Sequence, residues 1–283
     1  MIKMLCNELF EEEETIFPQI FEYNNRSQTL LLGDCIEEMK KMDEKSIDLI
    51  CSSPPFNSNQ IYRSYKDNLP RQKYLSWMND VFKEIKRIIK DDGSFFLNVG
   101  FTSTDPWIAT DVAKEASNYF ILQNTIVWLK SFTFNNITHG HFKPVNSKRY
   151  VNRLFEYVFH FTSTGKVGID RLAIGVSYKD SGNINRWKKH NKLKCRGNIW
   201  FIPYATIRNK AERGNHPATF PSELAENCIK LHGIKKDMVV LDPFLGIGST
   251  LIATTKLGVK GIGVDIDEEY LKVAARKIRE MSV

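Results

Sequence analysis

Cysteine is scarce in this chain and poorly placed for cross-linking or metal binding. The 283 residues include five cysteines, far apart and without a C-x-x-C pair: Cys6, Cys35, Cys51, Cys195 and Cys228. Disulfide frameworks and zinc sites need closely patterned cysteines, so we expect neither, and reduced thiols are typical of a cytoplasmic protein. His139-Gly140-His141 suggests a metal site, but no Cys or carboxylate is spaced to complete one, so we expect no metal.

Long apolar runs are also missing. No apolar run of about 18 residues or more occurs. The N-terminus reaches the acidic run 11–14 without the basic start and apolar core of a signal peptide. We therefore expect a soluble, cytoplasmic protein without a membrane partner.

The chain does contain enough apolar sequence for one large core. Hydrophobic residues make up 42% of the 283 positions, which suits a single domain over 1–283. Apolar runs of strand length alternate with amphipathic stretches, such as a predicted helix over 74–89. We expect strands near 29–32, 47–51, 94–99, 121–129, 154–161, 238–242 and 261–264. The alternation predicts an α/β fold with a mainly parallel sheet and helices on both faces.

Basic residues gather in the middle of the chain. Residues 130–213 contain 17 Lys or Arg against four Asp or Glu, although the net charge of the whole chain is only +7. Regular alternation fades over 165–213, which we interpret as an irregular basic insertion that recognises a polyanion; a merely solvated surface is the alternative. Phe132, Phe134 and Phe142 are possible wedges. The candidate phosphate contacts are Lys148, Arg149, Arg186, Lys188, Lys189, Lys192 and Lys194.

A glycine-containing turn follows the predicted strand at 238–242. Gly246 and Gly248 allow a tight turn into a helix and close approach of a ligand to the backbone, and Asp265 at the next strand end can bind ribose hydroxyls. This context favours nucleoside binding over a purely structural turn. Leu251 stands where a dinucleotide fingerprint has its third glycine, so a NAD or FAD site is disfavoured.

A second unusual stretch, Ser53-Pro54-Pro55-Phe56, follows the predicted strand at 47–51. Its prolines remove two backbone donors, and on its own the stretch could simply begin a loop. Together with Asp242-Pro243-Phe244-x-Gly246-x-Gly248-Ser249-Thr250, however, it resembles the paired signatures of S-adenosylmethionine-dependent DNA amino-methyltransferases. The motif order, with the serine motif first, is similar to the circularly permuted order of the β class, and the similarity covers the chain beyond about residue 28.

This resemblance implies a Rossmann-like methyltransferase fold with S-adenosylmethionine as cofactor. The cofactor-binding residues that it implies are Asp34, His216, Pro217, Phe220, Pro221, Asp242, Pro243, Phe244, Gly246, Gly248, Ser249 and Asp265. Asp34 could instead serve only as a helix cap. Two positions depart from the family pattern: Ile247 stands where a small Ser is frequent, and Ser249 departs from a common Gly-Thr run.

The resemblance also implies that Ser53, Pro54, Pro55 and Phe56 are catalytic. An exocyclic amine of cytosine or adenine is a weak nucleophile because its lone pair is delocalised into the ring. The Ser53 hydroxyl and the Pro54 carbonyl can accept hydrogen bonds from that amine, and Phe56 offers a flat face on which an extruded base can stack. Carbon-5 methylation is disfavoured because it needs a thiolate, and no cysteine follows a proline as in that family.

We therefore expect methyl transfer to the N4 amine of cytosine in double-stranded DNA. By resemblance, Ser at position 53 favours cytosine, because N6-adenine enzymes of this class more often carry Asp there. N6-adenine methylation is the close alternative, and RNA methylation or non-catalytic DNA binding are further ones. A monomer or homodimer acting beside a cognate restriction endonuclease is what the resemblance implies about partners.

Overall fold

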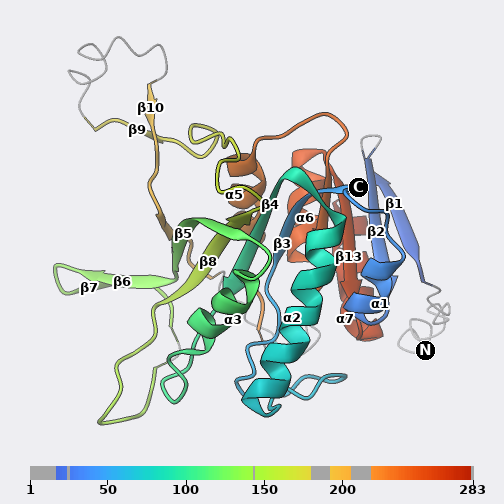
Figure 1. Ribbon diagram of the computed structural model, residues 1–283. Coiled ribbons are helices and arrows are strands. Elements are labelled where there is room, and N and C mark those ends of the chain that lie inside the picture. The colour runs from blue at the N-terminus through green and yellow to red at the C-terminus, as the bar shows by residue number, and fades with distance from the viewer. Residues whose placement is uncertain (1–16, 24–25, 143, 180–191, 205–217, 282–283) are drawn as a thin grey trace, which may run out of the picture.

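The computed structural model describes residues 17–23, 26–142, 144–179, 192–204 and 218–281. Within them the chain builds one nine-stranded sheet with the strand order β1-β2-β13-β12-β3-β4-β8-β5-β11. Helices cover both faces of this sheet (Figure 1). The predicted α/β architecture is confirmed.

Most strands of the sheet run in one direction. These strands are β2 (Arg26–Leu32), β13 (Lys260–Asp265), β12 (Val239–Asp242), β3 (Ile47–Ser52), β4 (Ile89–Val99), β5 (Ile121–Leu129) and β11 (Ile199–Phe201). Two strands oppose them. β1 (Gln19–Tyr23) pairs with β2 at one edge, and β8 (Phe155–Thr162) lies antiparallel between β4 and β5. The sheet is thus mainly parallel, as predicted.

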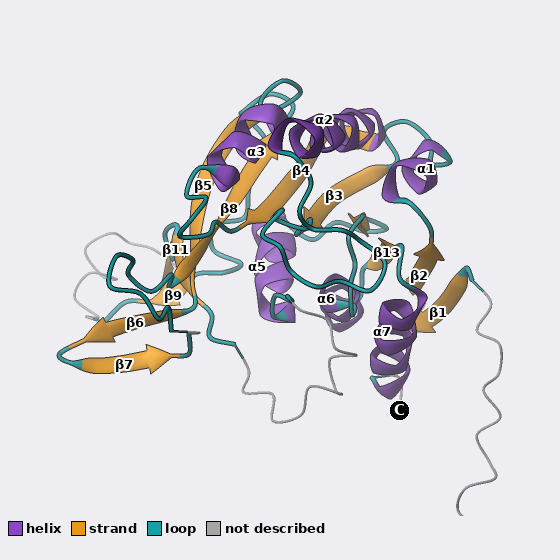
Figure 2. Ribbon diagram, turned by 90° about the horizontal axis from the view of Figure 1, so that it is seen from below, coloured by secondary structure: helices purple, strands orange, loops and turns teal. Residues whose placement is uncertain are grey.

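Two helix layers enclose the sheet (Figure 2). One layer contains α1 (Cys35–Lys40), α2 (Arg71–Ile88) and α3 (Ile108–Ala116), and the other contains α5 (Ser222–His232), α6 (Ser249–Leu257) and α7 (Glu268–Glu280). Strand β3 is buried along its whole length, which explains its near-continuous apolar sequence. None of the helices in the described ranges combines the length and apolar character needed to cross a bilayer.

The start of β4 differs from the sequence-based expectation. Residues 91–93, between the helix predicted over 74–89 and the strand predicted near 94–99, are part of the strand, which begins directly after α2. A Cβ at Gly93 would lie 2.9 Å from the Asp48 carbonyl oxygen and 2.7 Å from Cγ1 of Ile89. The glycine therefore permits close packing of β4 against β3 and does not end a turn.

The segment 165–213, expected to be an irregular insertion, contributes a strand to the sheet. Strand β11 forms the edge beside β5, and Trp200 within it is buried, with Nε1 donating to the Gly197 carbonyl at 3.0 Å. A three-residue strand is too short to show periodicity in the sequence. The other described elements of this segment are the short strands β9 (Val176–Ser177) and β10 (Leu193–Lys194).

A separate hairpin projects from the edge of the molecule. Strands β6 (Ser131–Phe134) and β7 (Ile137–Gly140) pair antiparallel and stand away from the main sheet in both ribbon views (Figures 1 and 2). Between the hairpin and β8, residues 141–142 and 144–154 form a loop at the end of the molecule where the parallel strands finish (Figure 1).

Candidate functional site

The carboxyl ends of the parallel strands border a cavity of about 620 Å³. Figure 2 looks onto this end of the sheet, where loops meet between the two helix layers. The 53–56 turn after β3 and the 243–247 loop after β12 both line the cavity. These strands are neighbours in the sheet, since Leu241 pairs with Ile50. The two motifs, far apart in sequence, therefore face one space.

One carboxylate ties the two motifs together. The Ser52 hydroxyl donates to Oδ1 of Asp242 at 2.5 Å, and the Thr250 hydroxyl donates to Oδ2 at 2.6 Å. The backbone N–H of Phe244 also donates to Oδ1, at 3.1 Å. Asp242 is fully buried, and burial raises the pKa of its carboxyl to about 6. The resemblance implied that Asp242 binds the cofactor, but Asp242 does not line the cavity; it supports the two loops that do.

Asp265 lies on the cavity wall at the end of β13. Its carboxylate accepts hydrogen bonds from the backbone N–H groups of Gly246, at 2.7 Å, and Asp267, at 2.9 Å. Burial raises the pKa of Asp265 to about 6, against the opposing effect of these donors. The carboxylate thus orients the glycine loop while remaining at the surface of the cavity.

Gly248 has a structural role that its motif position did not reveal. Its φ of 93° lies in the left-handed region, and a Cβ there would stand 2.8 Å from Cβ of Ala274 in α7. Glycine is needed because the loop packs directly against that helix. Gly248 does not line the cavity, contrary to the expectation for this residue.

Asp34 is a helix cap, and it also lies on the cavity wall. Its side chain caps α1, with Oδ1 accepting from Ile36 N at 2.9 Å and from Glu37 N at 3.2 Å, and the residue also lines the cavity. Beside it, burial and the Asp34 charge raise the pKa of the Cys35 thiol well above its usual range. Cys35 is therefore a protonated thiol and a poor nucleophile.

The segment before α5 is only partly described. His216 and Pro217 lie outside the described residues, whereas Phe220 lines the cavity and its carbonyl accepts from the Ser249 hydroxyl at 2.6 Å. Pro221 is the N-cap of α5 and does not line the cavity, contrary to the expectation for it. Four other residues of the predicted cofactor set lie on the cavity wall: Pro243, Phe244, Gly246 and Ser249.

On the Ser53 side of the cavity, a side-chain amide fixes the serine hydroxyl. Ser53 Oγ donates to Oδ1 of Asn98 at 3.1 Å, and Nδ2 of Asn98 donates to the Tyr157 carbonyl at 3.0 Å. Only one orientation of the amide satisfies both contacts. Ser53 therefore gives its proton to Asn98 and keeps its lone pairs to accept a hydrogen bond.

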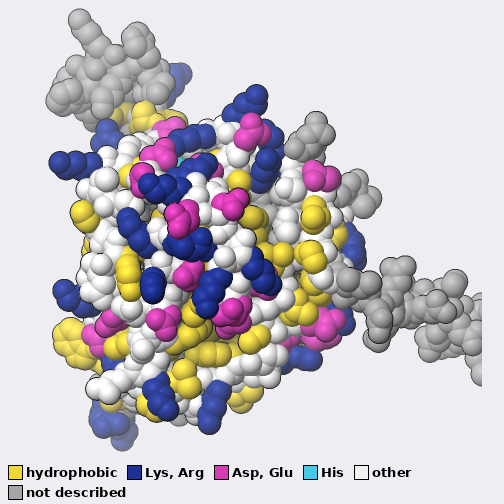
Figure 3. All heavy atoms as spheres, turned by 45° about the vertical axis from the view of Figure 1, so that its right-hand side comes forward, with side chains coloured by type: hydrophobic (Ala, Val, Ile, Leu, Met, Phe, Trp, Pro, Cys, Tyr) yellow, Lys and Arg dark blue, Asp and Glu magenta, His cyan; other side chains and the backbone are white. Residues whose placement is uncertain are grey.

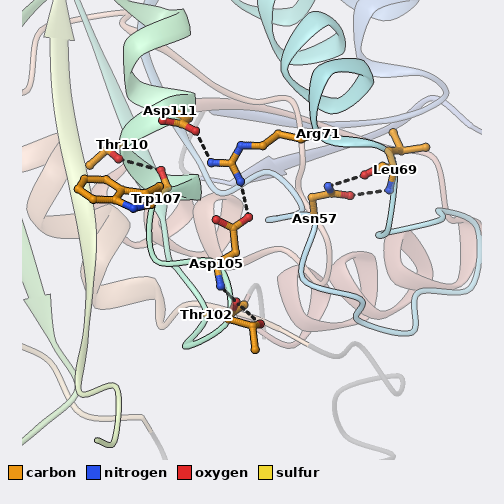
Figure 4. A network of polar contacts seen from close by, with 9 residues as sticks. Asn57, Leu69, Arg71, Thr102, Asp105, Trp107, Thr110 and Asp111 are labelled. Atoms are coloured by element: carbon orange, nitrogen blue, oxygen red, sulfur yellow. Dashed lines mark hydrogen bonds and ion pairs between the residues drawn. The ribbon is translucent and has the colours of Figure 1, made fainter. Parts of the chain in front are cut away.

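A hydrogen bond from helix α2 stabilises the proline turn. The hydroxyl of Tyr74, which is fully buried in α2, donates to the Pro55 carbonyl at 2.6 Å. Figure 4 shows how the surrounding loops are joined. The side chain of Asn57 exchanges two hydrogen bonds with the backbone of Leu69, and Arg71 binds both Asp105 and Asp111.

The loop 57–69 forms another wall of the cavity and was not anticipated from the sequence. Buried Asp67 accepts from the backbone N–H groups of Asn57 at 2.8 Å and Gln60 at 2.9 Å. Ser64 then donates to Oδ2 of Asp267 at 2.8 Å. The loop thereby links the 53–56 turn to the Asp265 end of the cavity.

A charged pair lies among aromatic residues beside Phe56. Lys130 at the end of β5 binds Glu156 of β8, and each side chain is only 15% exposed. The Lys130 ammonium lies 4.8 Å from the ring centroid of Trp128 and 5.2 Å from that of Tyr204. All four residues line the cavity. No local sequence pattern identifies Lys130 and Glu156 as neighbours, because pairing of β8 with β5 brings them together.

The predicted phosphate contacts divide into three groups. Lys148 and Arg149 are exposed on the loop 141–154, at the cavity end of the molecule (Figure 1). Lys192 and Lys194 lie near the β9–β10 ribbon, at the opposite end of the sheet, so the structure does not bring them to the cavity (Figure 1). Arg186, Lys188 and Lys189 lie outside the described residues. On the face seen in Figure 3, basic and acidic side chains are interspersed.

The predicted wedge residues also differ in position. Phe142 lines the cavity, whereas Phe132 packs in the hairpin stem against His139, with ring centroids 4.9 Å apart. Phe134 is exposed at the hairpin tip. The described part of the chain has no group of three or more His, Cys, Asp or Glu placed to hold a metal ion.

Comparison with known proteins agrees with this geometry. A family described as DNA methylase, whose members modify N6 or N4 amines, matches residues 47–276. The type II methyltransferase M.ScaI of Streptomyces caespitosus is 30% identical over 90% of this chain and 83% of its own length. The DNA adenine methyltransferase YhdJ of Escherichia coli K12 is 26% identical over 90% of this chain and 84% of its own length.

The fold has a solved counterpart. The structure of the PvuII cytosine-N4-specific DNA methyltransferase superimposes with a TM-score of 0.66 and 21% identity, covering 90% of this chain and 91% of that one. The family match spans most of the chain, and the serine motif precedes the glycine motif in sequence. The chain therefore belongs to the N6/N4 DNA methylases, as a β-class DNA amino-methyltransferase of the restriction–modification type.

Proposed function

We propose that this protein transfers a methyl group from S-adenosylmethionine to the N4 amine of a cytosine extruded from double-stranded DNA. The observation that carries the proposal is the shared cavity: Ser53 and Pro54 lie on one wall, and Gly246 and Asp265 lie on another. An acceptor for an amine and an acceptor for ribose hydroxyls thus face the same space.

The residues on the Asp265 side fit a nucleoside cofactor. Asp265 is a carboxylate at a strand end, beside a glycine loop that lets a ligand approach the backbone. Aromatic rings adjoin it, since Trp77 packs edge-on against Phe244 with centroids 5.6 Å apart. When bound, S-adenosylmethionine supplies an electrophilic methyl group on a positively charged sulfur.

The residues on the Ser53 side would orient the amine. Ser53 Oγ and the Pro54 carbonyl accept the two N–H bonds of the amine, so that its nitrogen lone pair points toward the methyl carbon. Phe56 stacks on the ring of the extruded base. Alignment of this kind can lower a barrier by up to about 7–11 kcal/mol. The new N–C bond forms as the C–S bond breaks, and the amine then loses one proton to an acceptor or to water.

N6-adenine is the second candidate. Ser at position 53 supports cytosine through the family resemblance, and the PvuII neighbour carries cytosine-N4 specificity in its name. The E. coli relative is named an adenine methyltransferase, and this supports the alternative. A cognate restriction endonuclease belongs to the proposal as well, because M.ScaI is named a type II methyltransferase.

One experiment separates these outcomes. The protein is incubated with labelled S-adenosylmethionine and either duplex DNA or RNA, and the digested nucleosides are analysed by mass spectrometry. We expect labelled N4-methyl-2′-deoxycytidine, from DNA alone. Labelled N6-methyl-2′-deoxyadenosine would overturn the cytosine assignment, label only in RNA would overturn the DNA assignment, and no label in either polymer would overturn the catalytic function.

A further inference from the structure

The β6–β7 hairpin is rooted in the cavity wall at both ends. Lys130, which directly precedes β6, and His141, which directly follows β7, both line the cavity. Each strand has four residues, so the tip stands about 13 Å from the cavity wall. The hairpin therefore projects from the rim of the site where we place the target base.

The stem of the hairpin is held firmly. Ser131 Oγ donates to the His139 carbonyl at 2.7 Å, and the Phe132 ring packs edge-on against Phe201 of β11 with centroids 4.8 Å apart. At the tip, Asn135 and Asn136 have positive φ values of 48° and 61°, which suit a two-residue hairpin turn. An isolated two-stranded hairpin is marginally stable, so this anchoring gives the tip a defined position.

The tip presents an apolar pair to solvent. Phe134 and Ile137 face each other across the hairpin and are 64% and 61% exposed. One exposed apolar side chain needs no explanation, but a cross-strand pair at the end of a rigid projection is a surface suited to a partner. Phe and Ile are among the side chains that proteins insert between base steps of DNA.

The surrounding charge favours nucleic acid as that partner. Residues 131–154 contain four Lys or Arg and no Asp or Glu. A polyanion complements such a segment, whereas a second copy of this chain would bring two basic segments together. A two-stranded β-ribbon is also narrow enough to enter the major groove of B-DNA.

We propose that the hairpin tip, Phe134 and Ile137, inserts into the duplex and takes the place of the base that leaves the stack. This inference rests on the proposed function. Extrusion costs a few kcal/mol, and stacking on Phe56 returns only about 1–3 kcal/mol, so a second apolar contact within the duplex is needed to favour the extruded state.

The test compares duplexes that differ in the free energy needed to extrude the target base. Sequencing of DNA methylated by the protein first identifies the recognition site. Single-turnover methylation is then measured on a matched duplex and on one whose target base faces a mismatch, which lowers the cost of extrusion. The protein with both Phe134→Ser and Ile137→Ser is compared with wild type and with Thr133→Ala, an exposed stem residue on the other face of the hairpin.

We expect the doubly substituted protein to lose on the order of tenfold in rate on the matched duplex, to recover most of it on the mismatched duplex, and to keep its cofactor affinity. Thr133→Ala should behave as wild type. Equal rates on the matched duplex, or an equal loss on both duplexes, would overturn the inference. A dimer seen by light scattering that the two substitutions dissociate, without effect on duplex methylation, would identify a second copy as the occupant.

The failure of this inference is distinguishable from failure of the proposed function. If wild-type protein methylates no DNA, the proposed function fails. Fluorescence anisotropy with the same variants and a duplex carrying one abasic site still measures insertion of the tip into a stack that lacks a base. Unchanged affinity there would overturn the wedge independently of turnover.

Discussion

The Ser53 hydroxyl lies 3.1 Å from Oδ1 of Asn98 and donates its proton to that atom. Because Asn98 also donates to the Tyr157 carbonyl, its amide cannot turn to present Nδ2 to the serine. Ser53 is thereby held as an acceptor toward the cavity, which is the state that an amine substrate needs. The hydrogen bond between Ser53 and Asn98 therefore determines that the serine hydroxyl accepts, and does not donate, on the cavity side.

Substitution of Ser53 by Ala should lower single-turnover methylation about tenfold or more, or about 1.4 kcal/mol of transition-state stabilisation, because one amine acceptor is lost. Cofactor affinity, measured by calorimetry, should not change. Ser58→Ala, another serine on the cavity wall, is the matched control. An unchanged rate for Ser53→Ala would refute the orienting role.

Asn98 acts through Ser53, so their substitutions should not add. We expect Asn98→Ala to lower kcat with little change in KM, since the amide positions the serine hydroxyl. The protein with both Ser53→Ala and Asn98→Ala should be about as slow as Ser53→Ala alone. Additive losses in this double-mutant cycle would mean that Asn98 acts independently. Circular dichroism controls for folding, since Asn98 is buried.

Phe56→Ala should weaken capture of the extruded base by about 1–3 kcal/mol. The loss should appear in DNA affinity and in kcat/KM on a matched duplex, and it should persist on a mismatched duplex because the stacking surface itself is gone. This persistence distinguishes Phe56 from the hairpin tip. Equal activity of variant and wild type on both substrates would count against stacking.

Asp242→Ala should destabilise the fold, because it leaves three donors without their acceptor: Ser52 Oγ, Thr250 Oγ1 and Phe244 N. Each buried unsatisfied group costs about 1–3 kcal/mol, which urea denaturation can measure. Asp242→Asn keeps Oδ1 as an acceptor and should cost much less. A similar loss for both variants would show that the charge, and not the hydrogen bonding, is what matters.

The raised pKa of Asp242 also gives stability a definite pH dependence. Its folded pKa of about 6 lies above the ordinary value for Asp, so the folded state binds the proton more tightly than the unfolded state does. The contribution of this group to stability is therefore greatest below about pH 4 and falls as pH rises toward 6. Asp242→Asn should flatten the stability profile in this window.

Cofactor binding should depend on the ionisation of Asp265. Its pKa of about 6 predicts that affinity for S-adenosylmethionine is constant above pH 7 and falls as pH drops below 6, because the protonated carboxyl accepts fewer ribose hydrogen bonds. Calorimetry from pH 5 to 8 measures this. Asp265→Asn should bind more weakly at pH 7 and lose the dependence; a variant with the wild-type profile would exclude Asp265 as its source.

Much of the sheet could be predicted because its strands have local signatures. Strand β3 is an apolar run, and the glycine turn after β12 precedes a helix whose end is marked by Gly258. The orientation of β8 could not be predicted, because its sequence does not distinguish a parallel from an antiparallel buried strand. Strand β11 was too short to detect.

The site was predictable where a motif is continuous in sequence, as in the 53–56 turn. Asn98 carried one usable signal: it is a polar residue at the carboxyl end of an apolar parallel strand, where ligand-binding side chains gather. Lys130 and Glu156 carried none, since only strand pairing makes them neighbours. The motif also could not show that Asp242 is buried behind the cavity wall, because its burial depends on contacts with Ser52 and Thr250.

The bond between Ser52 and Asp242 joins the chain segment before the amine acceptors to the one before the glycine loop. Movement of either segment is therefore transmitted to the other through this buried hydrogen bond as well as through the pairing of β3 with β12. In the proposed mechanism, the position of the methyl donor is thus coupled to the orientation of the target base. A variant selected to use a new cofactor analogue should therefore also need compensating changes in the residues that orient the base.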